Sequence, residues 1–187
     1  MEIYLVRHGQ DLDNANGILN GHRDQDLTPL GIQQTDSAAD LLIGRNIDVI
    51  CSSPSLRARH TAQIIADKLN LAEVETLPNL IERDFGTLTG KPITDIPKLA
   101  KKTFATDKIL YFTEAEGAED FPTLLVRAKD VLKYITEKYP NKNIVLVTHG
   151  DTGKMIQAAY YDWDWEKGLR APFFANSEIL PLKKDVY

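Results

Sequence analysis

The stretch Ile3-Tyr4-Leu5-Val6-Arg7-His8-Gly9 decides the fold. Its four apolar residues predict a buried strand, whose carboxyl end then carries an arginine and a histidine. A second stretch, Ile144-Val145-Leu146-Val147-Thr148-His149-Gly150, repeats the pattern. Ligands of open α/β sheets bind off the carboxyl ends of the strands, so the two stretches predict two imidazoles facing one crevice. We expect the glycine after the first histidine to let the backbone turn without a Cβ clash.

The composition predicts a folded protein with an acidic surface. The chain has 187 residues, of which 43% are hydrophobic, so we expect a single domain, 1–187, with one sizeable insertion. The net charge of −5 argues against non-specific nucleic-acid binding, which needs a basic face. The only cysteine, Cys51, lies in an apolar run. No internal disulfide can form, and we interpret Cys51 as a small core residue.

Neither a signal peptide nor a membrane helix is predicted. The first strand begins at once, and no apolar run reaches the roughly 20 residues that a membrane span needs. We therefore expect a cytoplasmic location, with no membrane and no nucleic acid among the partners. The sequence leaves a homodimer open.

Apolar runs alternate with helical periodicity along most of the chain. This alternation predicts a three-layer α/β/α fold with a mostly parallel central sheet. Thr28-Pro29 has the pattern of an N-cap followed by proline in the first helical turn. The predicted strands cover residues 2–7, 47–51, 73–77, 143–148 and 178–182. The predicted helices cover about 28–44, 55–69, 122–139 and 151–161.

Two segments lack a clear period. Residues 10–27 are polar and predict a loop. Glycines and prolines interrupt residues 80–121, where we predict a short helix around 95–104 and a loop over 105–121. We interpret about 87–121 as a cap-like insertion of helix and loop over the C-terminal edge of the sheet.

Candidate chemical groups follow the strands or begin helices: His8, Arg57, Glu82 and His149. An imidazole can attack phosphorus when the attacking nitrogen is unprotonated and donors neutralise the phosphoryl oxygens. We predict His8 as this nucleophile. Arg7 and Arg57 supply fork-shaped donors, and His149 adds another if it is protonated. Glu82 is the available acid for the leaving oxygen.

A metal site is the competing interpretation, because the chain has four histidines. They do not form a His-x-x-x-His pair, and no second cysteine supports them. We therefore predict no metal. The histidines are His8, His22, His60 and His149.

In this pattern the chain resembles the histidine phosphatase superfamily, which includes cofactor-dependent phosphoglycerate mutases and broad phosphatases. The matching motifs run in order through nearly the whole sequence. They are Arg7-His8-Gly9, Asp26-Leu27-Thr28-Pro29-Leu30-Gly31, Ser52-Ser53-Pro54-Ser55-Leu56-Arg57-Ala58, Leu80-Ile81-Glu82-Arg83-Asp84-Phe85-Gly86 and Val147-Thr148-His149-Gly150.

The resemblance implies a set of roles. His8 would become a phosphohistidine that water then hydrolyses, with Glu82 as acid and then base and His149 beside it. The phosphate would be bound by Arg7, Asn14, Arg57 and Gly150. Neither a metal nor another cofactor would be required, and the partner would be a small-molecule phosphate ester.

Several residues depart from the family pattern. Mutases of the family are usually longer and read Glu-Arg-His-Tyr-Gly, where this chain has Asp84 and Phe85. Both changes favour simple hydrolysis. Asp11 and Asp13 stand where the family often has Ser or Thr and a large apolar residue, and they add acidity to the pocket loop. Glu119 is interpreted as structural or as part of the pocket wall.

We therefore predict a metal-independent phosphomonoester hydrolase. A phosphoglycerate mutase is the alternative, and a non-catalytic phospholigand-binding protein of the same fold is a third.

Overall fold

The central sheet of the computed structural model has five strands in the order β3-β2-β6-β1-β7. The structure describes residues 1–172 and 174–183. Within this sheet all strand pairs are parallel except β1 with β7. The sheet is therefore mostly parallel, as predicted. The strands are β1 (Ile3–Arg7), β2 (Val49–Ser52), β3 (Val74–Thr76), β6 (Ile144–Thr148) and β7 (Ile179–Leu182).

The register of β1 and β6 determines where the two histidines emerge. Arg7 pairs with Thr148 at the carboxyl ends of these adjacent strands. The next residues, His8 and His149, therefore leave the sheet side by side. This is the arrangement that the repeated sequence pattern predicts.

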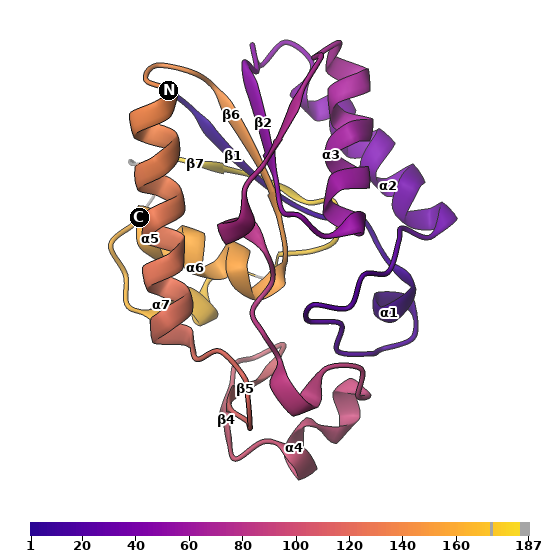
Figure 1. Cartoon of the computed structure of the whole chain (residues 1–187), viewed down its shortest axis with the longest axis vertical. Helices are drawn as coiled ribbons and strands as arrows, with labels where there is room; N and C mark the ends of the chain where they lie inside the picture. The colour runs from indigo at the N-terminus through magenta and orange to yellow at the C-terminus, as the bar shows by residue number, and fades with distance from the viewer. Residues whose placement is uncertain (173, 184–187) are drawn as a thin grey trace.

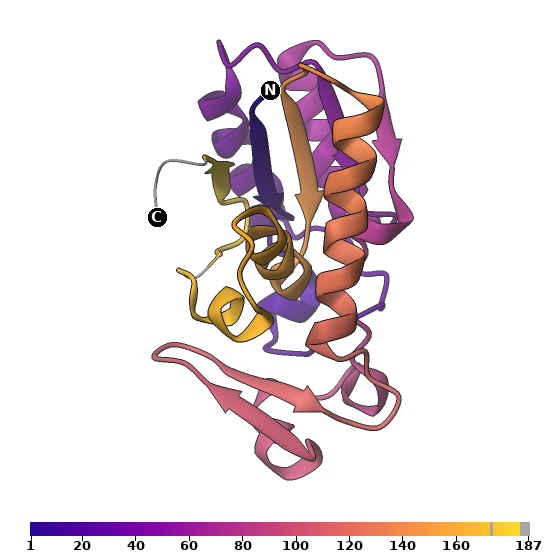
Figure 2. The ribbon, with the colours of Figure 1, turned by 90° about the vertical axis from the view of Figure 1, so that its left-hand side faces the viewer.

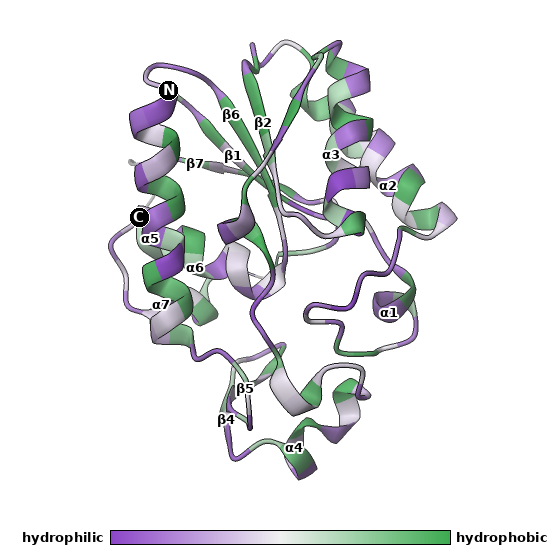
Figure 3. Ribbon diagram, viewed as in Figure 1, coloured by the Kyte–Doolittle hydropathy of each residue, from purple (hydrophilic) through white to green (hydrophobic). Residues whose placement is uncertain are grey.

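Helices cover both faces of the sheet (Figures 1 and 2). Alternate strand residues belong to opposite cores, because successive side chains of a strand point to opposite faces. Leu5 packs in the core on the α5 and α6 side, and Val6 packs in the core on the α3 side. Figure 3 shows the central strands β2 and β6 as mainly apolar. The helices are α2 (Pro29–Ala39), α3 (Leu56–Leu69), α5 (Phe121–Lys138), α6 (Gly150–Tyr160) and α7 (Trp165–Arg170).

Two local predictions agree with the structure. The Thr28 hydroxyl accepts a hydrogen bond from the Gly31 N–H at 3.0 Å, and Pro29 opens α2. The Cys51 side chain is buried in the core, where burial raises the pKa of its thiol to about 12. Within the described part of the chain, no helix combines the length and apolarity needed to span a bilayer.

The prediction for residues 95–121 was wrong in part. The helix α4 spans only Ile96–Leu99, and an antiparallel hairpin of β4 (Lys102–Ala105) and β5 (Leu110–Glu114) replaces the expected end of the helix and much of the loop. Each strand is too short to show an alternating period. The hairpin is stabilised by tertiary packing instead, since Phe104 contacts Trp165 edge-on and Tyr111 contacts Phe121.

Short elements complete the chain. The predicted loop 10–27 contains one helical turn, α1 (Leu12–Ala15), and α7 was not predicted. Residues 86–114, which we call the cap, lie beyond the carboxyl ends of β1 and β6 (Figure 2). The 3-10 turns are η1 (Asp40–Leu42), η2 (Pro78–Leu80), η3 (Gly86–Leu88) and η4 (Ile93–Asp95).

Candidate active site

His8 is buried at the end of β1 with one ring nitrogen fixed. Its Nδ1 lies 2.7 Å from the Gly9 carbonyl oxygen. A carbonyl can only accept, so Nδ1 carries the proton and Nε2 keeps its lone pair. Burial, and then the charges of Arg57 and Arg7, hold the pKa of His8 well below its usual range. The neutral ring can therefore act as a nucleophile through Nε2.

His149 lies beside it, with the two ring centroids 5.0 Å apart. Its Nδ1 lies 3.2 Å from Arg57 Nη2, and its Nε2 lies 2.7 Å from Ser53 Oγ. A guanidinium only donates, so Nδ1 accepts and the ring proton sits on Nε2. Burial and the charge of Arg57 hold the pKa of His149 well below its usual range. His149 is therefore neutral in this state. The additional donor that a protonated His149 would supply to the phosphate is absent.

Arg57 is the centre of the cluster and is completely buried. Its Nη1 donates to the Arg23 carbonyl oxygen at 2.7 Å, and its Nη2 donates to the Gly21 carbonyl oxygen at 2.9 Å. Its Nε donates a hydrogen bond to the lone pair of His8 Nε2 at 3.3 Å. The guanidinium is thus held against the nitrogen predicted to attack phosphorus, where it can also neutralise a phosphoryl oxygen.

Asp11 is a buried partner of Arg57. Its Oδ2 lies 3.2 Å from Arg57 Nε, and its Oδ1 accepts from the Asn14 N–H at 2.7 Å as the N-cap of α1. Burial raises the pKa of Asp11. Asp13 pairs instead with Arg23 at 2.8 Å. The two acids therefore brace the loop and Arg57, and they do not line the cavity described below.

The Glu82 carboxylate contacts the N-terminal end of α6. Its Oε1 accepts from the Thr152 N–H at 3.0 Å, from the Thr152 hydroxyl at 3.1 Å and from the Arg83 N–H at 2.9 Å. Its Oε2 accepts only a longer bond, 3.3 Å, from the Asp151 N–H. Oε2 is the oxygen more available to a substrate.

Arg7 and Glu82 flank Gly150. A Cβ at Gly150 would lie 3.7 Å from Glu82 Oε2 and 3.8 Å from Arg7 Cζ. Arg7 Nη1 donates to the Phe174 carbonyl oxygen at 2.8 Å. The absence of a side chain at position 150 keeps open the space between a guanidinium and a carboxyl group.

Asn14 is oriented by a residue that the motif analysis did not single out. The Asn176 side-chain amide donates to Asn14 Oδ1 at 2.9 Å and to the His8 carbonyl oxygen at 3.0 Å. Asn176 precedes β7, which lies next to β1. No local sequence signal marks it, because its role depends on that strand order.

Gly9 avoids a Cβ clash, as predicted, but the clash would be with α2 and not within its own turn. It does not have a positive φ. A Cβ there would lie 2.6 Å from the Gly31 carbonyl oxygen and 2.6 Å from Thr35 Oγ1. The glycine is required because the backbone of α2 packs directly against the turn that carries His8.

Arg83 links the site to the cap and was also missed. Its guanidinium lies 2.8 Å from the Asp151 carboxylate and stacks 4.0 Å from the Phe112 ring centroid. Nearby, Glu119 pairs with Arg127 at 2.7 Å, which fits the structural interpretation of Glu119. Both arginines are ordinary charged residues in the sequence, and only the fold brings them to the site.

A cavity of about 430 Å³ opens over these groups. Of the predicted residues, Arg7, Asn14, Glu82 and Gly150 line it. His8, Arg57 and His149 are buried beside them and contact one another. The structure therefore brings all seven predicted residues together. Among the residues it describes, no group of three or more His, Cys, Asp or Glu could hold a metal ion.

Comparison with known proteins agrees with this geometry. The model of the histidine phosphatase superfamily (branch 1) matches residues 3–183. Phosphoglycerate mutase-like protein 4 of Arabidopsis thaliana is 35% identical over 156 residues, covering 80% of this chain and 66% of the relative. The metal-independent phosphoserine phosphatase of the same plant is 33% identical over 160 residues, covering 83% and 66%. The chain thus spans just under two thirds of the length of these relatives.

A solved structure extends the similarity over almost the whole fold. Phosphoserine phosphatase from Entamoeba histolytica, in complex with 3-phosphoglyceric acid, has a TM-score of 0.78 and 27% sequence identity. The match covers 96% of this chain and 89% of that chain.

Proposed function

Because the chain belongs to the histidine phosphatase superfamily (branch 1), we propose that it hydrolyses phosphomonoesters through a phosphohistidine on His8. The observation that carries the proposal is the state of this ring. Nδ1 is fixed by a carbonyl oxygen, and Nε2 faces the guanidinium of Arg57. This is the protonation state that attack on phosphorus requires, and the Nε2 lone pair becomes free when the Arg57 N–H turns from Nε2 to a phosphoryl oxygen.

The first step transfers the phosphoryl group. His8 Nε2 forms a bond to phosphorus while the ester P–O bond breaks, and Arg57, Arg7 and Asn14 neutralise the phosphoryl oxygens. Glu82, protonated at Oε2, gives its proton to the leaving alcohol oxygen. The products of this step are the free alcohol, phospho-His8 and the Glu82 carboxylate.

The second step restores the enzyme. Glu82 takes a proton from a water molecule, whose oxygen bonds to phosphorus as the N–P bond breaks. Inorganic phosphate leaves, with Glu82 protonated again and His8 neutral. Gly150, the first residue of α6, completes the proposed phosphate site, and neutral His149 supports it indirectly by accepting a hydrogen bond from Arg57 Nη2.

Every proton and electron pair in this scheme is carried by side chains, so we propose that no metal ion or other cofactor is required. The proposed partner is a small phosphorylated metabolite. A cytoplasmic location remains a prediction.

The test measures release of p-nitrophenol from p-nitrophenyl phosphate with a chelator present throughout. We expect wild-type protein to turn over under these conditions and the His8→Ala variant to lose nearly all of its rate. His60→Ala is the matched control, because His60 lies outside the site and bonds to Asp26 at 2.8 Å. Activity that survives His8→Ala, or that chelator alone abolishes, would overturn the proposal.

Phosphoglycerate mutase activity is the second candidate, supported by the names of some relatives. Hydrolysis is favoured because Phe85 stands where mutases have tyrosine and so lacks its hydroxyl. The Phe85 ring packs edge-on against Phe112 instead. A coupled assay with 3-phosphoglycerate and a trace of 2,3-bisphosphoglycerate distinguishes the two. We expect phosphate release and no sustained interconversion.

A further inference from the structure

The cavity changes character beyond the phosphate end. There its walls are mainly apolar side chains from the 17–20 loop, from the turn after Glu82 and from the cap. Ile93 is half exposed, while Phe85 and Phe112 are buried. Binding sites for small molecules commonly have this composition, with a few polar groups that orient the ligand. The apolar residues of this wall include Ile18, Leu19, Phe85, Ile93, Ile96 and Phe112.

Backbone hydrogen bonds preform this wall. The Leu19 N–H donates to the Lys91 carbonyl oxygen at 2.9 Å, and the Gly90 N–H donates to the Leu19 carbonyl oxygen at 2.7 Å. The Ile93 N–H donates to the Gly17 carbonyl oxygen at 2.9 Å. The backbone that carries the apolar side chains of Ile18 and Ile93 is therefore held in place before any substrate arrives.

The charged groups of the distal wall already have partners or solvent. Arg83 and Asp151 bind each other at 2.8 Å. The Lys154 ammonium, whose pKa burial lowers to about 8, donates to the carbonyl oxygens of Ala171 and Pro172. Lys108 is exposed. An anionic group on the alcohol would have to compete for Lys154 or bind in solvent.

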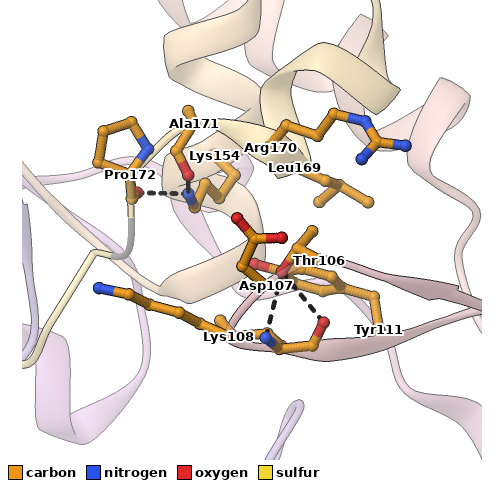
Figure 4. A pocket seen from close by; sticks show the side chains of 10 residues that line it. Thr106, Asp107, Lys108, Tyr111, Lys154, Leu169, Arg170, Ala171 and Pro172 are labelled. Carbon is orange, nitrogen blue, oxygen red and sulfur yellow. Dashed lines mark hydrogen bonds between the residues drawn. The ribbon is translucent and has the colours of Figure 1, made fainter.

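A side cavity of about 320 Å³ adjoins the main one and shares Lys108, Tyr111 and Lys154 with it (Figure 4). Figure 4 shows the Lys154 nitrogen between the two carbonyl oxygens, with the Asp107 carboxylate in the same space. Of the described residues, Asp107 is the one acid that lines the side cavity, and the cations Lys108, Lys154 and Arg170 line it as well. The side cavity is therefore charged, unlike the apolar wall of the main cavity on which the inference rests.

From these walls we infer that the substrate is a phosphomonoester whose alcohol is apolar and larger than a three-carbon hydroxy acid. The inference rests on the proposed phosphatase function and specifies its substrate class. The phosphate end supplies Arg7 and Arg57, and the alcohol packs on the apolar wall behind Ile93.

The test uses a series of n-alkyl phosphates, from ethyl through butyl to hexyl phosphate, whose leaving alcohols are chemically alike. Burial of each added methylene should raise kcat/KM by about two- to fourfold. O-phosphoserine and 3-phosphoglycerate are the anionic comparators, and we expect both to be turned over more slowly than hexyl phosphate. Phosphate release is measured for every compound.

Two variants locate the effect. Ile93 lines the cavity and is 50% exposed, so Ile93→Ser should leave folding intact and reduce the hexyl-to-ethyl ratio of kcat/KM at least about threefold. Leu99→Ser is the matched control, since Leu99 is 46% exposed on the same cap and does not line the cavity. It should leave the ratio unchanged.

The outcomes separate this inference from the function on which it rests. If no ester, including p-nitrophenyl phosphate, releases phosphate, the proposed function fails. If phosphate is released but the alkyl series is flat, or phosphoserine exceeds hexyl phosphate, only the substrate class is wrong. A steep series that Ile93→Ser and Leu99→Ser change equally would also overturn the assignment of the wall.

Discussion

Replacing Asp11 with serine tests how a buried carboxylate affects the phosphate site. Asp11 Oδ2 lies 3.2 Å from Arg57 Nε, which lies 3.3 Å from His8 Nε2. Because the two contacts share one atom, the carboxylate lies within about 6.5 Å of the nitrogen that would carry phosphorus. At an effective dielectric constant of about 20, two unit negative charges at this separation repel by roughly 2.5 kcal/mol.

We expect Asp11→Ser to bind inorganic phosphate at least about tenfold more tightly. The full repulsion corresponds to roughly 70-fold, and movement of the released Arg57 offsets part of it. The serine hydroxyl can still accept from the Asn14 N–H, so the cap of α1 is retained. Calorimetric titration with phosphate measures the affinity directly, and product inhibition of p-nitrophenyl phosphate hydrolysis gives an independent value.

Asp13→Asn is the control, because Asp13 pairs with Arg23, whose side chain is 41% exposed and screened by solvent. Its phosphate affinity should change by less than about twofold. Weaker phosphate binding by Asp11→Ser would refute the reasoning. It would mean that Asp11 contributes more by holding Arg57 in place than it costs by repulsion.

Three further predictions concern stability. Gly9→Ala puts a Cβ 2.6 Å from the Gly31 carbonyl oxygen, which should cost about 1–3 kcal/mol and lower Tm by about 2–4 °C per kcal/mol; an unchanged Tm contradicts this. Arg83→Met leaves the largely buried carboxylate of Asp151 without its partner. The free energy of unfolding, measured with denaturant, should fall by about 3–5 kcal/mol. A second change, Asp151→Asn, should restore part of this loss. The pKa of His149 is depressed in the folded state, so the unfolded state binds more protons below about pH 6.5. Stability should therefore fall with decreasing pH there, by up to about 1.4 kcal/mol per pH unit for this group, and His149→Gln should show a shallower fall than wild type; equal slopes would exclude the effect.

The parts of the fold that were predicted correctly have strong local signals. The strands β1 and β6 are buried on both faces, so each is a continuous apolar run. Thr28 and Pro29 mark the start of α2 through cap chemistry that acts within four residues. The hairpin in the cap has no such signal, because its four- and five-residue strands depend on contacts with Trp165 and Phe121.

The candidate site likewise has a part that the sequence predicts and a part that it does not. The positions of His8, Arg57, Glu82 and His149 after strands or at helix starts are enough to predict that these side chains meet at one edge of the sheet. Those positions do not show how Arg57 is held, because its acceptors include backbone carbonyl oxygens, which leave no mark in the sequence. The sequence also does not reveal the interactions that oppose phosphate binding. An aspartate in a loop gives no indication that it is buried against the central arginine.

The backbone bonds that join residues 17–19 to residues 90–93 have a consequence for protein engineering. The cap shares a seam with the loop that follows α1, so it is not an independent module. A chimera that exchanged residues 86–114 alone keeps these bonds only if the new backbone follows the same path beside residues 17–19. A graft intended to transfer substrate choice from one relative to another should therefore carry the short 17–19 segment with it.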